Sequence, residues 1–409
     1  MTLGAITERE SARAFDAADP LAGFRERFLV PEGDLVYLDG NSLGRPPLVT
    51  RERLERMVVD EWAGDLIRGW DRWLDLPERV GDLIADTIIG ARRGEVIVSD
   101  STTVNLFKLA SAALDAMPDR RTVVIARDEF PTDRYVLEGL ARARGLTVRW
   151  IDDDPLDGPT VDDVAGALDR TVALVVLSLV NYRSAAIADL PGITARARDA
   201  GAVVLWDLSH AAGSITVQLD SDGADLAVGC TYKYLNGGPG APAFLYLRRD
   251  LQERLRNPIQ GWFGQRDQFL MGPTYQPAPG IRSWLTGTAG IPALVAVEEG
   301  VRLVADGGLE RIRAKGIALT EYAIRLHDAW LAPLGFTLGS PRDPSRRGAH
   351  VAIRHPRASE LTTRLIDRGV IPDFREPDSI RLGMSPLTTS FDDVWRGLSA
   401  LRSLVAEDR

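Results

Sequence analysis

Residues 171–210 read TVALVVLSLVNYRSAAIADLPGITARARDAGAVVLWDLSH, and this stretch decides the fold class. Its two ends, 171–180 and 202–210, are apolar runs without polar alternation, which is the pattern of strands buried on both faces. The segment LPGITARARDAGA between them has the length of a crossover helix. The stretch therefore predicts a strand–helix–strand unit of an α/β protein, with a mostly parallel sheet and helices on both faces.

The same alternation extends to either side of this unit. Further apolar runs are EVIVSD (95–100), TVVIARDEF (122–130), ADLAVGC (224–230) and APAFLYLRR (241–249). We expect a large sheet domain over residues 65–290, then a long connecting helix (about 289–332) and a small α+β domain within 291–409. We expect residues 1–64 to pack with the small domain and with a dimer partner.

Composition narrows the class of function. The chain of 409 residues is 45% hydrophobic and 26% charged, as in ordinary globular proteins, and its net charge of −9 argues against a nucleic-acid partner. One cysteine, Cys230, excludes an internal disulfide, and four histidines argue against a multi-histidine metal site. The first residues, MTLGAITERESARAF, lack an apolar run, so we expect no membrane contact and a cytoplasmic location. From the few cysteines and histidines we expect no metal.

Polar side chains gather where the predicted strands end, which is where ligands of open α/β sheets bind. They are the hydroxyl residues 101–103, Phe130 with Asp133, Ser178, Asp207 with His210, and Tyr232 with Lys233. Taken one at a time, each has an ordinary structural interpretation. Ser and Thr cap helices, Asp forms turns, and a lone His is more often a core residue than a catalyst.

Taken together, these residues match the needs of pyridoxal 5′-phosphate. Its aldehyde needs a lysine amine, its ring nitrogen needs a carboxylate, and its phosphate needs hydroxyls and free backbone N–H groups at a helix start. Lys233, Asp207 and the segment 101–105 offer these groups. Nucleotide binding is less favoured, because the glycines of GGPG lack the GxGxxG spacing and the chain contains no GxxxxGK[ST].

Seven segments along the chain carry a more specific resemblance. They are YLDGNSLG (37–44), TTVNL (102–106), FPTD (130–133), WDLSHAA (206–212), YKYLN (232–236), GWFG (261–264) and WLTGT (284–288). With them the chain resembles the kynureninases, within the aspartate aminotransferase-like (fold type I) family of pyridoxal-phosphate enzymes. The resemblance runs nearly end to end.

The resemblance implies a role for each cofactor-contacting residue. Lys233 would hold the cofactor covalently, Asp207 would pair with its ring nitrogen, and His210 would support that carboxylate. Phe130 would stack on the ring, with Asp133 at the ring hydroxyl. The phosphate end would be held by Thr102, Thr103, Ser178 and Tyr232, and by Trp262 and Thr288 from the second subunit of a homodimer.

The resemblance also implies a substrate site and a reaction. Arg381 would clamp the substrate α-carboxylate, as a bidentate guanidinium does well, and Ser42 and Trp70 would contact its aromatic end. The reaction would be hydrolysis of a carbon–carbon bond of L-kynurenine, or of its 3-hydroxy derivative, to anthranilate or 3-hydroxyanthranilate and L-alanine, in tryptophan catabolism. The catalytic residues would be Lys233, Asp207 and Tyr232, with Tyr232 serving as proton donor or as phosphate ligand.

Two alternatives remain open at this point. Another fold type I enzyme, such as a cysteine desulfurase or an aminotransferase, shares the Asp–Lys pair, although Cys230 is badly placed for desulfuration. A non-catalytic effector-binding module of a transcriptional regulator is the second alternative. The acidic charge balance and the retained lysine and aspartate argue against it.

Overall fold

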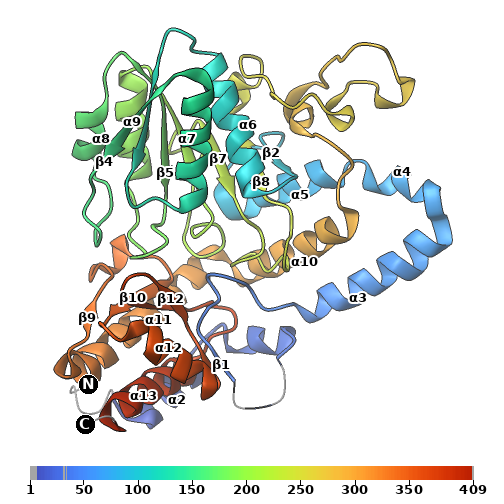
Figure 1. Cartoon of the computed structure of the whole chain (residues 1–409). Helices are drawn as coiled ribbons and strands as arrows, with labels where there is room; N and C mark the ends of the chain where they lie inside the picture. The colour runs from blue at the N-terminus through green and yellow to red at the C-terminus, as the bar shows by residue number, and fades with distance from the viewer. Residues whose placement is uncertain (1–6, 31–32, 34, 408–409) are drawn as a thin grey trace.

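A seven-stranded sheet forms the centre of the larger part of the molecule in the computed structural model, which describes residues 7–30, 33 and 35–407 (Figure 1). The strand order is β2-β8-β7-β6-β5-β3-β4. The bounds are β2 Val96–Val98, β3 Thr122–Ala126, β4 Thr147–Ile151, β5 Val172–Ser178, β6 Val203–Asp207, β7 Leu226–Gly229 and β8 Phe244–Leu247. Strands β4, β3, β5, β6 and β7 are parallel to their neighbours in this row, and β8 runs antiparallel to both β7 and β2.

Each central strand sends alternate side chains into two separate hydrophobic clusters, one on each face of the sheet. In β5, Leu174 and Val176 join the cluster formed with helices α6 (Thr102–Asp115) and α7 (Pro131–Arg144). Val175 and Leu177 join the other cluster. That cluster is formed with helices α5 (Leu76–Ile84), α8 (Val161–Ala167), α9 (Leu190–Asp199) and α10 (Ile291–Gly307). Burial on both faces explains why these strands read as unbroken apolar runs.

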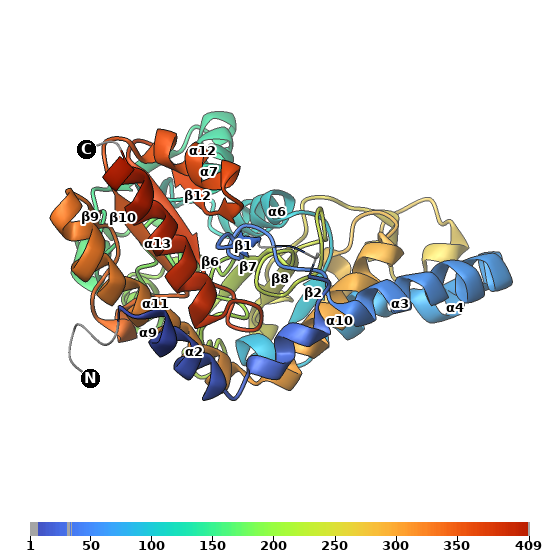
Figure 2. The same cartoon turned by 90° about the horizontal axis from the view of Figure 1, so that it is seen from below.

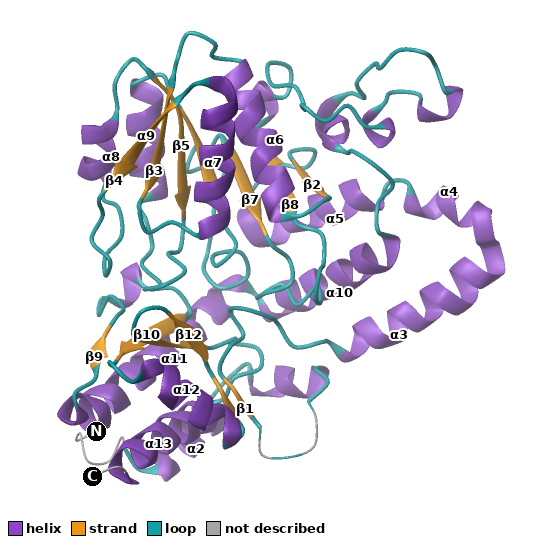
Figure 3. Cartoon of the chain, viewed as in Figure 1, coloured by secondary structure: helices purple, strands orange, loops and turns teal. Residues whose placement is uncertain are grey.

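A smaller part of the molecule lies below the carboxyl ends of the parallel strands (Figure 3). It contains an antiparallel sheet in the order β12-β13-β10-β9 and a parallel pair of β1 with β11. The strands are β1 Val36–Tyr37, β9 Thr337–Leu338, β10 His350–Arg354, β11 Val370–Ile371, β12 Asp373–Arg375 and β13 Ser379–Gly383. The helices are α2 Arg9–Ala17, α11 Leu309–Leu326, α12 Ala358–Asp367 and α13 Phe391–Glu407.

The N-terminal segment is tied to this smaller part by charge and by strand pairing. Arg9 in α2 lies 2.7 Å from Asp392 at the start of α13, and β1 pairs in register with β11. Ala12, Val36 and Leu38 belong to the same hydrophobic cluster as α11, α12 and α13.

The structure differs from the sequence-based expectation in three places. The long helix expected over 289–332 is two helices, α10 and α11, because Gly308 between them adopts φ +75°, which ends one helix and starts the next. Strand β8 runs antiparallel to its neighbours. Strand β4 adds an edge that the apolar runs did not indicate, since its residues are exposed or half-buried except for Ile151.

An arm projects from one side of the larger part in both Figure 1 and Figure 2. It consists of α3 (Leu48–Arg56), a π-helical continuation (Met57–Ala63), a 3-10 turn (Leu66–Gly69) and α4 (Trp70–Trp73). The loops around residues 255–280 extend on the same side in both views. Within the described part of the chain, no helix is both long and apolar enough to span a membrane.

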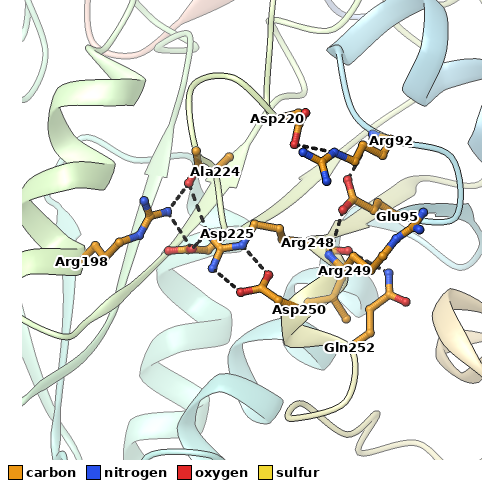
Figure 4. Close-up of polar contacts among 12 residues, drawn as sticks. Arg92, Glu95, Arg198, Asp220, Ala224, Asp225, Arg248, Arg249, Asp250 and Gln252 are labelled. Carbon is orange, nitrogen blue, oxygen red and sulfur yellow. Dashed lines mark hydrogen bonds and ion pairs between the residues drawn. The ribbon is translucent and has the colours of Figure 1, made fainter.

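An ion-pair network covers the amino-terminal edge of the large sheet, opposite the carboxyl edge that faces the smaller part (Figure 4). The buried Asp225, just before β7, accepts hydrogen bonds from Arg198 (3.3 Å) and Arg248 (2.6 Å). Glu95, just before β2, accepts from the backbone N–H groups of Arg92 (3.1 Å) and Arg249 (2.9 Å). These contacts fasten the amino-terminal edge of the sheet.

Candidate active site

A cavity of about 350 Å³ lies at the carboxyl edge of the large sheet. Its lining brings together most of the residues that the sequence nominated, from the ends of β2, β3, β5, β6 and β7. Those residues are Thr102, Thr103, Phe130, Asp133, Ser178, Asp207, His210, Tyr232 and Lys233. The cavity is also lined by Asp100, Ser101, Thr132, Ser209, Gly240 and Ala241.

Lys233 follows β7 in a tightly packed loop. Its side chain is 8% exposed, and Nζ lies 3.2 Å from Nε2 of His210 and 5.9 Å from the ring centroid of Phe130. The NSLG segment presses against this loop. The Gly44 N–H donates to the Tyr232 carbonyl at 2.8 Å, and a Cβ on Gly44 would lie 2.3 Å from the Lys233 carbonyl oxygen. Only glycine allows this approach.

Lysine is rare in this chain, which makes Lys233 distinctive. Only three of the 49 basic residues are lysines, and all three are buried. Lys108 lies 2.8 Å from Asp100, and Lys315 lies 2.6 Å from Asp19. Lys233 faces the cavity without an ion pair to a carboxylate within the described residues, so its amine is the one available for covalent chemistry.

Three buried carboxyl groups surround the cavity floor. Asp207, at the end of β6, accepts a hydrogen bond from the Ser209 N–H at 2.6 Å. Burial raises the pKa of Asp207, and the hydrogen bond from Ser209 and then the Lys233 cation oppose that rise. Burial, followed by the charges of Asp207 and Glu129, raises the pKa of Asp133 well above its usual range. The two carboxylate oxygens of Asp133 have no hydrogen-bond partner among the described residues.

The third carboxyl group is Glu129, which the sequence analysis did not single out. It is buried, and its two oxygens lie 2.8 Å from the Ser178 N and 2.5 Å from the Ser178 Oγ. Burial raises the pKa of Glu129 to about 7. Ser178 pairs with Asp207 across β5 and β6, so Glu129 and Ser178 lie beside Asp207, and three strands separate β5 from β2, which α6 follows.

The hydrogen-bond partner of His210 differs from the expected one. Its Nε2 is hydrogen-bonded to Lys233, whereas Asp207 receives its bond from Ser209. Burial, and then the positive charge of Lys233, lowers the pKa of His210 well below its usual range, so the ring is neutral and accepts from the lysine. The ring of His350 on β10 lies 5.7 Å away, and its two nitrogens have no partner among the described residues.

Helix α6 begins at the cavity wall, as its hydroxyl-rich sequence predicted. Ser101 caps it by accepting a hydrogen bond from the Val104 N–H at 3.3 Å, and Thr102 and Thr103 form its first turn. The free N–H groups and the positive end of the helix dipole favour an anion at this point.

These features fit pyridoxal 5′-phosphate. An amine, a buried carboxylate, an aromatic ring from Phe130 and a helix start line one cavity. Asp133 carries two buried oxygens that require a partner, and the hydroxyl of a pyridine ring would supply one. Within the described residues, no group of three or more His, Cys, Asp or Glu side chains is arranged to hold a metal ion.

Arg381 does not line this cavity. It is buried, and its guanidinium donates to the Tyr182 carbonyl (2.6 Å), to Ser42 Oγ (3.0 Å) and to Asp373, with which it forms an ion pair. The sequence analysis missed Asp373. The sequence signal was the pair of opposite charges two residues apart, Asp373 and Arg375, and in the structure Asp373 lies opposite Arg381 in the strand pair.

Trp70, Trp262 and Thr288 also lie outside the cavity. Trp70 packs edge-on against Trp73 and Phe263. Trp262 is largely exposed, and Thr288 is exposed at a second cavity of about 310 Å³. Trp70 is half-buried, Trp262 and Thr288 are exposed, and none of the three lines the cavity with Lys233.

Comparison with known proteins agrees with this geometry. Residues 312–401 match the family model of the kynureninase C-terminal domain. The kynureninase of Pseudomonas fluorescens is 42% identical over 98% of this chain and 96% of its own length. The kynureninase of Burkholderia pseudomallei (strain 1106a) is 42% identical over 97% of this chain and 95% of its own length.

Solved structures with lower identity share the fold. The apo cysteine desulfurase of Thermococcus onnurineus NA1 superposes with a TM-score of 0.81 at 20% identity, over 91% of this chain and 95% of that one. The Escherichia coli cysteine desulfurase CsdA has a TM-score of 0.81 at 18% identity, over 95% and 98%. A C-DES variant with glycine covalently linked to its PLP cofactor has a TM-score of 0.80 at 17% identity, over 90% and 97%.

Proposed function

The chain belongs to the kynureninase family of pyridoxal-phosphate enzymes, and from this premise we propose which of its residues carry out the reaction. The reaction is the hydrolytic cleavage of L-kynurenine to anthranilate and L-alanine. The observation that carries the assignment of residues is the meeting of Lys233, His210 and Asp207 at one cavity.

The cofactor supplies an electron sink that stabilises negative charge on the substrate α-carbon. Lys233 would hold the cofactor through its amine, and the same amine, once free, would take the substrate α-proton. Neutral His210 accepts a hydrogen bond from Lys233 Nζ and so orients the amine. Asp207 keeps the ring nitrogen protonated, because a buried carboxylate stabilises an adjacent positive charge.

The remaining cavity residues bind and orient. Thr102 and Thr103 would hold the phosphate at the start of α6, and Asp133 would bond the ring hydroxyl, which would give one of its two unpartnered oxygens a partner. We assign Ser178 to the ring end, because its hydroxyl lies against Glu129 beside Asp207. Tyr232 lines the cavity with its ring centroid 6.0 Å from Lys233 Nζ, which supports a role as proton donor or as phosphate ligand.

We propose Arg381 as the substrate carboxylate site, and we assign Ser42 to the same site rather than to the aromatic end of the substrate that the resemblance implied. Their mutual hydrogen bond of 3.0 Å places a hydroxyl on a buried guanidinium at the junction of the two parts of the molecule. A substrate carboxylate reaches this guanidinium by replacing Asp373 in its ion pair.

The alternative of cysteine desulfuration is disfavoured by the setting of Cys230. Its thiol is buried, with Sγ 3.7 Å from the Ser209 carbonyl, and burial raises its pKa. A thiol held in this way is neither exposed nor ionised, whereas an attacking sulfur must be both.

We also propose a homodimer with shared active sites. The arm exposes apolar side chains, with Ile67 77% exposed, and the 255–280 loops expose Leu270 to the same degree. The arm and the loops extend on one side of the molecule, and Trp262 lies within the loop segment. Exposed apolar side chains on both segments favour a protein interface on this side, and a second copy would bring Trp262 and Thr288 to the partner's phosphate site. For its location we propose the cytoplasm, since its one cysteine is unpaired.

Borohydride trapping tests the assignment of Lys233. The holoenzyme is reduced, digested and mapped by mass spectrometry, and we expect the cofactor mass on the peptide containing Lys233 and not on those containing Lys108 or Lys315. The Lys233→Ala variant should lose the trapped cofactor and at least three orders of magnitude of turnover, measured by anthranilate fluorescence. Trapping that persists in this variant would contradict the assignment.

A further inference from the structure

Lys108 is a fully buried cation within the apolar helix α6, two turns after its start. Its side chain is 0% exposed, and Nζ donates to Asp100 Oδ2 and to the Trp284 carbonyl, each at 2.8 Å. The catalytic assignments above give it no role. Burying a charge costs free energy unless the charge is paired, so the position of Lys108 is explained by its partner.

That partner, Asp100, stands directly before the Ser101 cap of α6. Its side chain is 22% exposed and lines both the cofactor cavity and the second cavity that contains Thr286 and Thr288. Asp100 adopts φ +53°, an uncommon conformation for a residue other than glycine. The Thr286 hydroxyl donates to its Oδ1 at 2.9 Å, so the carboxylate is held on two sides.

The charge of Asp100 has the wrong sign for this location. The proposed phosphate lies at the start of α6, next to Asp100. The cavity wall already carries the carboxyls of Asp133 and Asp207, and no arginine of this chain is among the described residues that line it. An uncompensated carboxylate at the phosphate end would therefore repel a phosphate dianion.

We propose that Lys108 is a positioning residue for the cofactor. Lys108 neutralises Asp100 from the buried side, and this neutralisation allows the start of α6 to bind a phosphate. The pair lets Asp100 hold Thr286 and the strained turn before α6 without repelling the ligand. This inference rests on the proposed placement of the phosphate at Thr102 and Thr103.

The choice of lysine fits this role. The chain uses arginine for nearly all of its cations, and only three of its 49 basic residues are lysines. A lysine ammonium is a compact charge that one carboxylate and one carbonyl can satisfy, whereas a guanidinium carries five donors. Burial lowers the pKa of Lys108, and the charge of Asp100 opposes that shift, so the cation depends on the same carboxylate that it neutralises.

Cofactor affinity measured without turnover tests the proposal. Apo forms of the wild type, Lys108→Met, Asp100→Asn and the double variant are titrated with pyridoxal 5′-phosphate and with pyridoxal, which lacks the phosphate. Binding is followed by tryptophan fluorescence. We expect Lys108→Met to bind the phosphorylated compound about ten- to a hundred-fold more weakly, the effect of one unpaired charge at an effective dielectric of about 20, with pyridoxal little changed.

The other two variants separate charge from shape. Asp100→Asn should bind the phosphorylated compound at least as tightly as the wild type, and the double variant should recover the loss of Lys108→Met. Equal losses with pyridoxal, or a double variant as weak as Lys108→Met, would overturn the proposal in favour of a purely structural pair. If Lys108→Met does not fold, weaker binding of pyridoxal 5′-phosphate by Asp100→Asn would overturn the proposal equally. Wild-type trapping at Lys233 tests the proposed function separately.

Discussion

At the scale of single residues, the site is dominated by buried carboxyl groups whose charges depend on one another. Burial raises the pKa of Glu129, Asp133 and Asp207. Hydrogen bonds from Ser178 and Ser209 oppose this rise for Glu129 and Asp207, and the Lys233 cation opposes it for Asp133 and Asp207. The sequence indicated Asp133 and Asp207 because each stands at a strand end beside an aromatic or a histidine. Glu129 belongs to the same strand end, but its pairing with Ser178, 49 residues away, depends on how β3 and β5 lie side by side.

Glu129→Gln tests this electrostatic picture through stability. Because burial raises the pKa of Glu129 from 4.5 to about 7, the folded chain keeps a proton that the unfolded chain releases in that range. Wild-type stability contributed by Glu129 therefore falls as pH rises from 4.5 to about 7 and is constant above it. The variant should gain up to about 3 kcal/mol relative to the wild type across this window, measured by denaturant unfolding of both apo proteins. Parallel stability curves would contradict it.

Asp373→Asn tests how substrate reaches Arg381. The ion pair occupies the guanidinium that we propose as the site of the substrate carboxylate, and Arg375 lies 2.8 Å from the same aspartate. With the aspartate neutral, the competing anion is removed while the amide keeps its shape. We expect KM to fall by roughly three- to ten-fold with little change in kcat, whereas Arg381→Lys should raise KM. A raised KM in Asp373→Asn would mean that the aspartate only orients Arg381.

At the scale of elements, the strands buried on both faces were predictable and the exceptions were not. Runs such as 171–180 contain enough apolar side chains to cover two faces, so they indicate β5 directly. Strand β4 escaped prediction because an edge strand buries little, and the direction of β8 is set by its pairing with β2 and β7 rather than by its composition. The Asp100–Lys108–Trp284 contact joins residues 176 positions apart, so only the folded chain brings it together.

Gly44→Ala tests the packing of the NSLG segment on the lysine loop. The added Cβ would lie 2.3 Å from the Lys233 carbonyl oxygen and 3.0 Å from the Asn236 Cα, so backbone must move. We expect a loss of about 1–3 kcal/mol in unfolding free energy and weaker cofactor binding, from calorimetry and titration. Gly23→Ala, where a Cβ meets nothing within 4 Å, is the matched control and should change neither quantity. Equal behaviour of the two variants would refute the packing argument.

At the scale of the whole molecule, the carboxyl edge of the large sheet faces the smaller part while the arm and the 255–280 loops extend sideways (Figure 1). The family was recognisable from sequence because its motifs lie in the segments that meet at the cavity. The proposed cross-subunit roles of Trp262 and Thr288 depend on a second copy. Both side chains are exposed and neither lines the cavity with Lys233, which is the physical reason to look for their partners on that copy.

Subunit mixing tests the shared sites. Lys233→Ala and Trp262→Ala are each expected to be inactive or strongly impaired as pure proteins. In mixed dimers, one site combines an intact Lys233 with an intact Trp262 from the partner. Co-refolding equal amounts should therefore restore roughly a quarter of wild-type activity. Sedimentation checks that dimers form, and no recovery despite mixed dimers would contradict shared sites.

The burial of Cys230 has a practical consequence for watching this assembly. It is the chain's one cysteine, it is 2% exposed, and burial raises its pKa, so thiol reagents should leave the folded protein unlabelled. A cysteine introduced at Ile67 on the arm would then be a single attachment point for a spin label or a fluorophore. Distances between two such probes would report directly on how the arms of two copies meet.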